Sequence, residues 1–81
     1  MSRRAGPVKF DVCADFGRRV REERERLGLS VHDVARRSRA TPHPVSVSTL
    51  HRIERGADVL LDRVGHVADA IGVPVRVLLS L

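Results

Sequence analysis

The 81-residue chain carries 15 basic and 10 acidic side chains, for a formal net charge of +5, with one cysteine, two phenylalanines and neither tryptophan nor tyrosine. This length predicts one small domain, the single cysteine excludes an intrachain disulfide, and the scarcity of aromatic rings argues against single-strand nucleic-acid binding, which uses stacking platforms. No stretch has the apolar character of a signal peptide or a membrane span, so we expect a soluble cytoplasmic protein.

The positive charge is unevenly distributed along the chain. Residues 1–26 carry eight basic and five acidic side chains, residues 27–56 carry five and two, and residues 57–81 carry two and three. The asymmetry favours a polyanionic partner for the first two thirds of the chain and a different task for the last quarter. Fourteen of the fifteen basic residues are arginine, so a compositional bias without functional meaning explains the charge equally well.

Residues 1–13 are predicted to form a flexible N-terminal arm, followed by one domain over residues 14–81. The arm shows no helical period, and Gly6–Pro7 interrupts any helix there. Its basic side chains suit the groove of a nucleic acid and a disordered terminus equally well. These side chains are Arg3, Arg4 and Lys9.

Asp15 is the predicted N-cap of a first helix that runs to about Leu27 and ends at Gly28. The helical repeat places four of its side chains on the inward face. They are Phe16, Val20, Arg24 and Leu27. Arg24 is the one charged residue among them, so the pattern alone gives it no evident partner.

A second helix is predicted after Ser30, which forms a capping box with Asp33. Its inward residues are Val31, Val34, Ala35 and Ser38. Residues 39–44 contain two prolines two positions apart, and each disfavours helical conformation in the residue before it, so we predict a loop there.

A third helix is predicted to begin at Ser46 or Ser48 and to end at Gly56. Its inward residues are Leu50 and Ile53. Glu54 lies four residues after Leu50 and therefore also leans toward the packed side.

The clearest helical stripe in the chain predicts a fourth helix that ends at Gly72. The stripe consists of Leu60, Leu61, Val64, Val67, Ala68 and Ile71. Pro74 suits the first position of a short fifth helix. A strand is the alternative for this segment, but a lone strand would have nothing to pair with. The elements together predict an all-α, compact five-helix domain.

Four segments of the chain, in this order and spacing, resemble the phage-repressor type of helix-turn-helix family (Cro/repressor, XRE-type). The segments are RERLGLS from Arg24, VA from Val34, STLHRIERG from Ser48 and ADAIGVP from Ala68. The resemblance covers about Phe16 to Leu79. It implies a sequence-specific transcriptional regulator, a repressor or controller, that binds double-stranded DNA as a homodimer on a palindromic operator and associates with the nucleoid. It implies neither enzymatic activity nor a cofactor.

By position, the resemblance implies that the helix from about Val47 to Arg55 enters the major groove and that Val47, Ser48 and Arg52 read bases. An arginine in that place reaches guanine in bidentate fashion. Alternatives remain open for two of these residues. Val47 is a surface or packing valine in one alternative, and Arg52 is a solvated or phosphate-binding side chain in the other. Predicted backbone or auxiliary DNA contacts are Ser30, Arg39, Thr41, His43, Ser46, Thr49, His51 and Arg55.

The resemblance also implies two structural features. In this family an arginine and a glutamate pair beneath the recognition helix, and the matching residues here are Arg24 and Glu54. Helices 4 and 5 dimerise many relatives, whereas the alternative is a monomer whose last helix closes the core. The residues expected in a dimer interface are Leu60, Val75, Leu78, Leu79 and Leu81.

The chain departs from the family pattern around its second helix. Val31 stands where the family has a glutamine that contacts phosphate, and Arg39–His43 are additional residues before Pro44, which replaces a glycine-containing turn. The inserted loop either supplies the missing phosphate contacts or has no role. Both departures favour an alternative function, a protein-interaction module or antitoxin of the same fold with weak DNA binding and a protein partner.

Histidine and cysteine positions show no metal-ligand spacing, so no metal site is predicted. These residues are Cys13, His32, His43, His51 and His66. Ser30, His32 and Asp33 lie within one helical turn, but nothing orients His32 as a base, and a capping role explains Ser30 better than a nucleophilic one.

Overall fold

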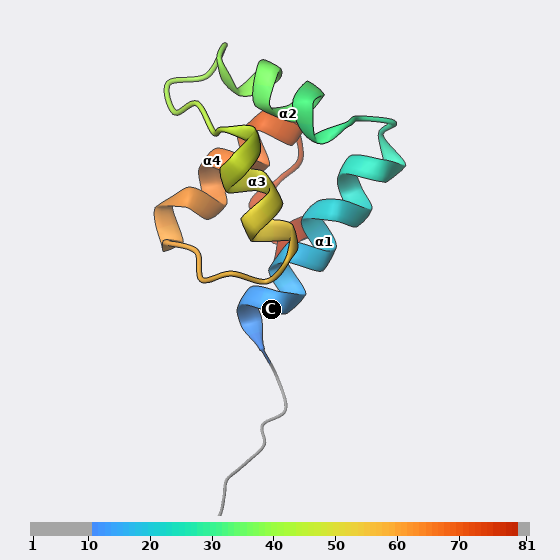
Figure 1. The fold of residues 1–81 in the computed structure, drawn as a ribbon, viewed down its shortest axis with the longest axis vertical. Helices are drawn as coiled ribbons and strands as arrows, with labels where there is room; N and C mark the ends of the chain where they lie inside the picture. The colour runs from blue at the N-terminus through green and yellow to red at the C-terminus, as the bar shows by residue number, and fades with distance from the viewer. Residues whose placement is uncertain (1–10, 80–81) are drawn as a thin grey trace, which may run out of the picture.

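A computed structural model of the protein describes residues 11–79, and this part of the chain contains five helices and no strand (Figure 1). The predicted all-α, five-helix fold is therefore confirmed. The helices are α1 (Val12–Arg26), α2 (Val31–Ser38), α3 (Val47–Glu54), α4 (Leu61–Ile71) and α5 (Val75–Leu78). Most of the predicted arm, with Arg3, Arg4 and Lys9, lies outside the described residues, as does Leu81.

The helices pack so that α3 lies between α1 and α2, while α2 also covers α4 (Figure 1). The short helix α5 packs against α1 and α4. Every helix contributes apolar side chains to one core, whose largest fully buried members include Phe16, Leu50, Ile71 and Leu78. Burying one face of each helix in a common core offsets the weak intrinsic stability of such short helices.

The first helix begins earlier than the sequence predicted. Its N-cap is Asp11, whose carboxylate accepts hydrogen bonds from the amides of Cys13 (3.0 Å) and Ala14 (3.1 Å). The assignment of the cap to Asp15 was wrong, because aspartate is favourable both at the N-cap and in the first turn, and the pattern does not separate the two. Leu27 was also wrongly placed inward: it follows the last helical residue and is 41% exposed.

The second helix has the predicted cap and the predicted inward face. The Asp33 amide donates to the Ser30 hydroxyl (3.0 Å), and the Ser30 amide donates to the Asp33 carboxylate (2.8 Å). This backbone hydrogen bond, together with the nearby Arg36, holds the pKa of Asp33 below its usual value. The four predicted inward residues are all buried; they are Val31, Val34, Ala35 and Ser38.

Residues between α2 and α3 form the predicted loop, and specific contacts fix its course. The buried Ser38 hydroxyl donates to the Ala35 carbonyl (2.6 Å) and accepts from the Val45 amide (2.8 Å), which closes the loop at its base. The Thr41 hydroxyl donates to the Ser38 carbonyl (2.7 Å). At the tip, the His43 ring stacks on the His66 ring of α4, with centroids 4.0 Å apart. These contacts attach the loop to α2 at its base and to α4 at its tip.

The fourth helix follows its predicted stripe only in part. Val64, Val67, Ala68 and Ile71 are buried, whereas Leu60 and Leu61, the first two residues of the predicted stripe, are 71% and 83% exposed. Both leucines stand at the N-terminal end of α4, where Leu60 is the N-cap and Leu61 is the first helical residue. Gly72 ends α4 in a left-handed conformation, as predicted, but Pro74 is the N-cap of α5 and not its first helical residue.

Helices α1 and α3 approach closely at Gly17, where an added Cβ would lie 2.1 Å from the Ile53 carbonyl oxygen. Because a backbone atom blocks that position, we expect Gly17→Ala to lower the free energy of unfolding by about 1–3 kcal/mol. Gly65→Ala in α4 is the matched control, since a Cβ there meets nothing within 4 Å. It should raise the free energy of unfolding by about 0.4–1 kcal/mol. Urea denaturation measures both, and equal stability of Gly17→Ala and the native chain would contradict this packing.

Candidate functional site

The first turn of α3 is fixed by Ser46, one of the two predicted caps. Its hydroxyl accepts a hydrogen bond from the Thr49 amide (3.1 Å) and donates to the Thr49 hydroxyl (3.0 Å). Leu50 and Ile53 anchor the opposite face of the helix, with 1% and 3% of their surface exposed. Ser48 is consequently left on the solvent side of the first turn.

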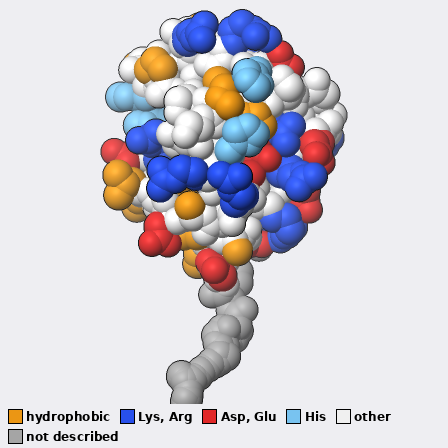
Figure 2. All heavy atoms as spheres, in the orientation of Figure 1, with side chains coloured by type: hydrophobic (Ala, Val, Ile, Leu, Met, Phe, Trp, Pro, Cys, Tyr) orange, Lys and Arg blue, Asp and Glu red, His pale blue; other side chains and the backbone are white. Residues whose placement is uncertain are grey.

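The outward face of α3 is basic. Ser48, His51, Arg52 and the C-capping Arg55 are exposed, and Figure 2 shows arginine and histidine side chains gathered at the centre of the view, over α3. The one acidic residue of the helix, Glu54, is turned inward and pairs with Arg24. A rigid helix with a basic outward face therefore results.

Arg24 and Glu54 form the bidentate ion pair that the resemblance implied. The Arg24 Nε and Nη2 atoms donate to the Glu54 carboxylate at 2.7 and 2.9 Å, and the two side chains are 13% and 10% exposed. Arg24 Nη1 also donates to the Leu29 carbonyl (2.9 Å). The hydrogen bonds to Glu54 raise the pKa of Arg24 above its usual value. One guanidinium thus joins α1, the turn before α2, and α3.

Several of the predicted DNA-contacting polar groups already hold the protein's own backbone. Ser30 and Ser46 cap α2 and α3, and the Thr41 hydroxyl stabilises the loop between these helices. His43 is stacked on His66, whereas Arg39 is exposed near the end of α2. Of these predicted contacts, Ser30, Ser46 and Thr41 therefore have structural roles within the chain, whereas Arg39 is open to a ligand.

Val47 and Val31, two valines singled out in the sequence, both contact the core. Val47 is half-buried and packs against the core, so only part of its side chain is open to solvent. Val31 is 8% exposed and belongs to the core itself. The absence of a polar residue at Val31 is explained by this packing.

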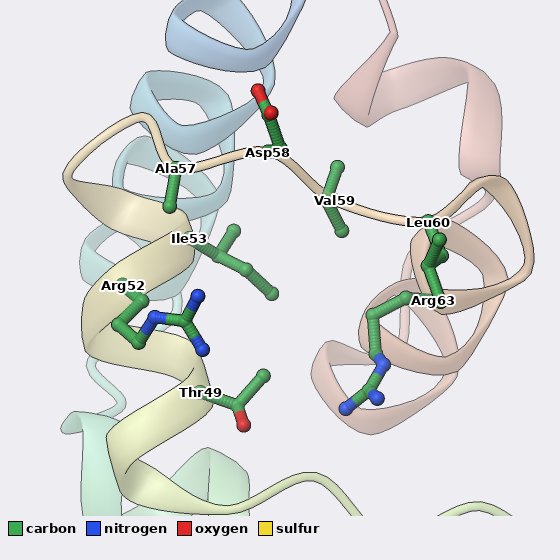
Figure 3. A pocket seen from close by; sticks show the side chains of 8 residues that line it. All are labelled: Thr49, Arg52, Ile53, Ala57, Asp58, Val59, Leu60 and Arg63. Atoms are coloured by element: carbon green, nitrogen blue, oxygen red, sulfur yellow. The ribbon is translucent and has the colours of Figure 1, made fainter.

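Two concave surfaces lie beside α3. Val47, Ser48, His51 and Arg55 line one of them. The second is a cleft of about 250 Å³ between α3 and the start of α4 (Figure 3). Its lining residues are Thr49, Arg52, Ile53, Ala57, Asp58, Val59, Leu60 and Arg63. Arg63 was not among the predicted site residues. The chain is rich in arginine, and the helical pattern of α4 alone does not show that this arginine lies beside α3.

Residues 15–81 match the family described as helix-turn-helix domain, and the chain belongs to this family. Its fold is similar to that of the restriction-modification controller protein C.AhdI from Aeromonas hydrophila, with 31% identity, a TM-score of 0.69, and coverage of 82% of this chain and 94% of that one. It is also similar to the DNA-binding domain of BldD, with 28% identity, a TM-score of 0.70, and coverage of 90% and 100%. No curated protein matches the chain in sequence. Over residues 11–79, none of the helices has the length and apolar character needed to cross a membrane.

The Arg24–Glu54 ion pair is testable by a double-mutant cycle. Arg24→Met or Glu54→Leu alone should lower the free energy of unfolding by about 3 kcal/mol, because each leaves one nearly buried charge without its partner. The double variant should lose less than the sum of the two, with a coupling of at least about 1 kcal/mol. Thermal and urea denaturation of the four proteins measure this coupling, and additive losses would show that the two side chains do not stabilise α3 together.

Proposed function

We propose that this protein is a sequence-specific, double-stranded DNA-binding transcriptional regulator, a repressor or controller, that reads the major groove with α3. Its membership of the helix-turn-helix family supports DNA binding, and so does its similarity to a controller protein and to a DNA-binding domain. The observation that carries the proposal is the exposed basic face of α3, which the Arg24–Glu54 pair and the Ser46 cap hold in one orientation.

The proposed recognition divides the outward face into base-reading and phosphate-binding side chains. Arg52 donates to guanine O6 and N7, Ser48 donates to or accepts from a base edge, and the exposed part of Val47 contacts a thymine methyl. Arg55, His51 and Arg39 are assigned to phosphates, because they lie exposed around that face. Most of the affinity then comes from cation–phosphate contacts and falls steeply with rising salt concentration.

The alternative function, a protein-interaction module or antitoxin, rests on Val31, which cannot contact phosphate, and on the inserted loop. Val31 is 8% exposed, so its packing in the core gives the valine a structural role that needs no protein partner. The inserted loop is fastened to α2 and to α4 through Ser38 and the His43–His66 stack. A salt titration on random duplex separates the two functions, since negligible affinity at low salt would favour a protein partner.

The protein is also proposed to act as a homodimer on a palindromic operator. Leu60 is 71% exposed and Val75 is 40% exposed, while Leu79 is half-buried, so apolar surface remains on α4 and α5. Leu78 is withdrawn from the expected interface, because it is fully buried within the single chain. A twofold dimer places two copies of α3 in successive major grooves, about 34–36 Å apart.

The assignment of Arg52 to a base is tested on a duplex selected from random sequence. Arg52→Ala should weaken binding of the selected duplex by about 1–3 kcal/mol, which is roughly 5-fold to 150-fold, with little change on random duplex. Arg55→Ala is the matched control and should weaken both duplexes to a similar degree. Equal losses on both duplexes for Arg52→Ala would instead assign Arg52 to the DNA backbone, and a selection that yields no consensus would refute sequence-specific binding.

The dimer is tested by adding charge to the exposed apolar surface. Leu60→Glu should shift the equilibrium toward monomer, because a carboxylate in an apolar interface loses its hydration. Val12→Glu provides a control at another exposed apolar residue, on α1, and should leave the association unchanged. Sedimentation equilibrium measures both. A native chain that stays monomeric at the concentrations where it binds DNA would contradict the dimer.

A further inference from the structure

The cleft between α3 and α4 has a chemical character that DNA reading by α3 does not account for. Figure 3 shows Arg52 extending from α3 and Arg63 extending from α4 on opposite walls, with Thr49 beside Arg52. Within residues 11–79, neither guanidinium has a hydrogen-bond or ion-pair partner. Two unpaired cations thus line one small cleft, and each of them repels the other.

Thr49 adds a third polar group to the same cleft. Its hydroxyl oxygen accepts a hydrogen bond from the Ser46 hydroxyl (3.0 Å), which leaves the Thr49 hydroxyl proton free to be donated. Two guanidiniums and one hydroxyl donor match the acceptors of a carboxylate or phosphate group. The Asp58 carboxylate, also at the cleft, projects away from both guanidiniums (Figure 3).

The remaining walls are apolar and come from Ile53, Ala57, Val59 and Leu60. The volume of about 250 Å³ lies below the roughly 300–1,000 Å³ of pockets for drug-sized ligands, so it suits a small metabolite. Leu60 also belongs to the proposed dimer surface, which the cleft therefore borders.

We propose that this cleft is an effector site for a small organic anion, a carboxylate or phosphate group attached to a compact apolar body. The anionic group binds Arg52, Arg63 and Thr49, and the apolar body packs against Ile53 and Val59. If the proposed DNA-reading role of Arg52 is correct, the anion and the DNA compete for the same guanidinium. Bound effector then releases the regulator from its operator.

The binding step is tested without DNA on the full chain by following NMR signals during titration. The probes are benzoate and phenyl phosphate, with benzamide as the neutral analogue and inorganic phosphate as the anion without an apolar body. Both organic anions should shift the signals of Thr49, Arg52 and Arg63 and saturate, and they should bind more tightly than benzamide and inorganic phosphate.

Arg63→Gln should weaken benzoate and phenyl phosphate binding at least about tenfold, because it removes one charge-assisted donor pair. Arg76→Gln is the matched control, since Arg76 is an exposed arginine on α5 that does not line the cleft. It should leave the affinity unchanged. Thermal denaturation of both variants without ligand verifies that they are folded.

Three results would overturn the effector site: no saturable binding, equal binding of benzamide, or shifts that gather on Val47, Ser48, His51 and Arg55 in place of the cleft. A fourth is a shift of the cleft's NMR signals on addition of the selected duplex but of neither organic anion, which would assign Arg63 to a DNA phosphate. Competition is measured separately, as the loss of duplex binding when phenyl phosphate is added at constant ionic strength. Anion binding by a chain that binds no DNA would retain the site and refute only the proposed regulation.

Discussion

The ion pair between Arg24 and Glu54 is the interaction on which the proposed interface depends. It joins the last turn of α1 to the last turn of α3, and its third hydrogen bond reaches the Leu29 carbonyl before α2. Two nearly buried charges contribute little net stability compared with an apolar pair, but they tolerate only a narrow range of geometries. The pair therefore fixes the direction of α3 more than it strengthens the fold.

Packing along the inward side of α3 supports the same orientation. The absence of a side chain at Gly17 lets α1 approach the carbonyl of Ile53, and Leu50 is buried in the core. The connector before α3 is closed by the Ser38 hydroxyl. Because Ile53, Leu50 and Glu54 occupy the inward side of α3, its outward side is left with exposed arginine and histidine side chains. The basic face is thus a consequence of the packing and not of the helix alone.

The loop between α2 and α3 is longer than in the family pattern, and contacts hold it in place. Loop-closure entropy grows slowly with length, so additional residues are tolerated where their ends are held. Here Ser38 holds the base of the loop, and the His43–His66 stack attaches its tip to α4. The inserted residues are therefore held at both the base and the tip of the loop that leads into α3.

Sequence periodicity and capping patterns determined the number of helices, the inward residues of α2 and most of the core. They also placed Arg24 and Glu54 on inward faces, since a helical repeat reports direction within one element. The same patterns misplaced the start of α1, because Asp11 and Asp15 are equally plausible caps. They also included Leu60 and Leu61 in the apolar stripe of α4, although both are exposed, because a repeat does not reveal which part of a helix its neighbours cover. Only the tertiary structure brought Arg63 beside Arg52 and His66 beneath His43, since both pairs join elements whose relative position no local pattern encodes.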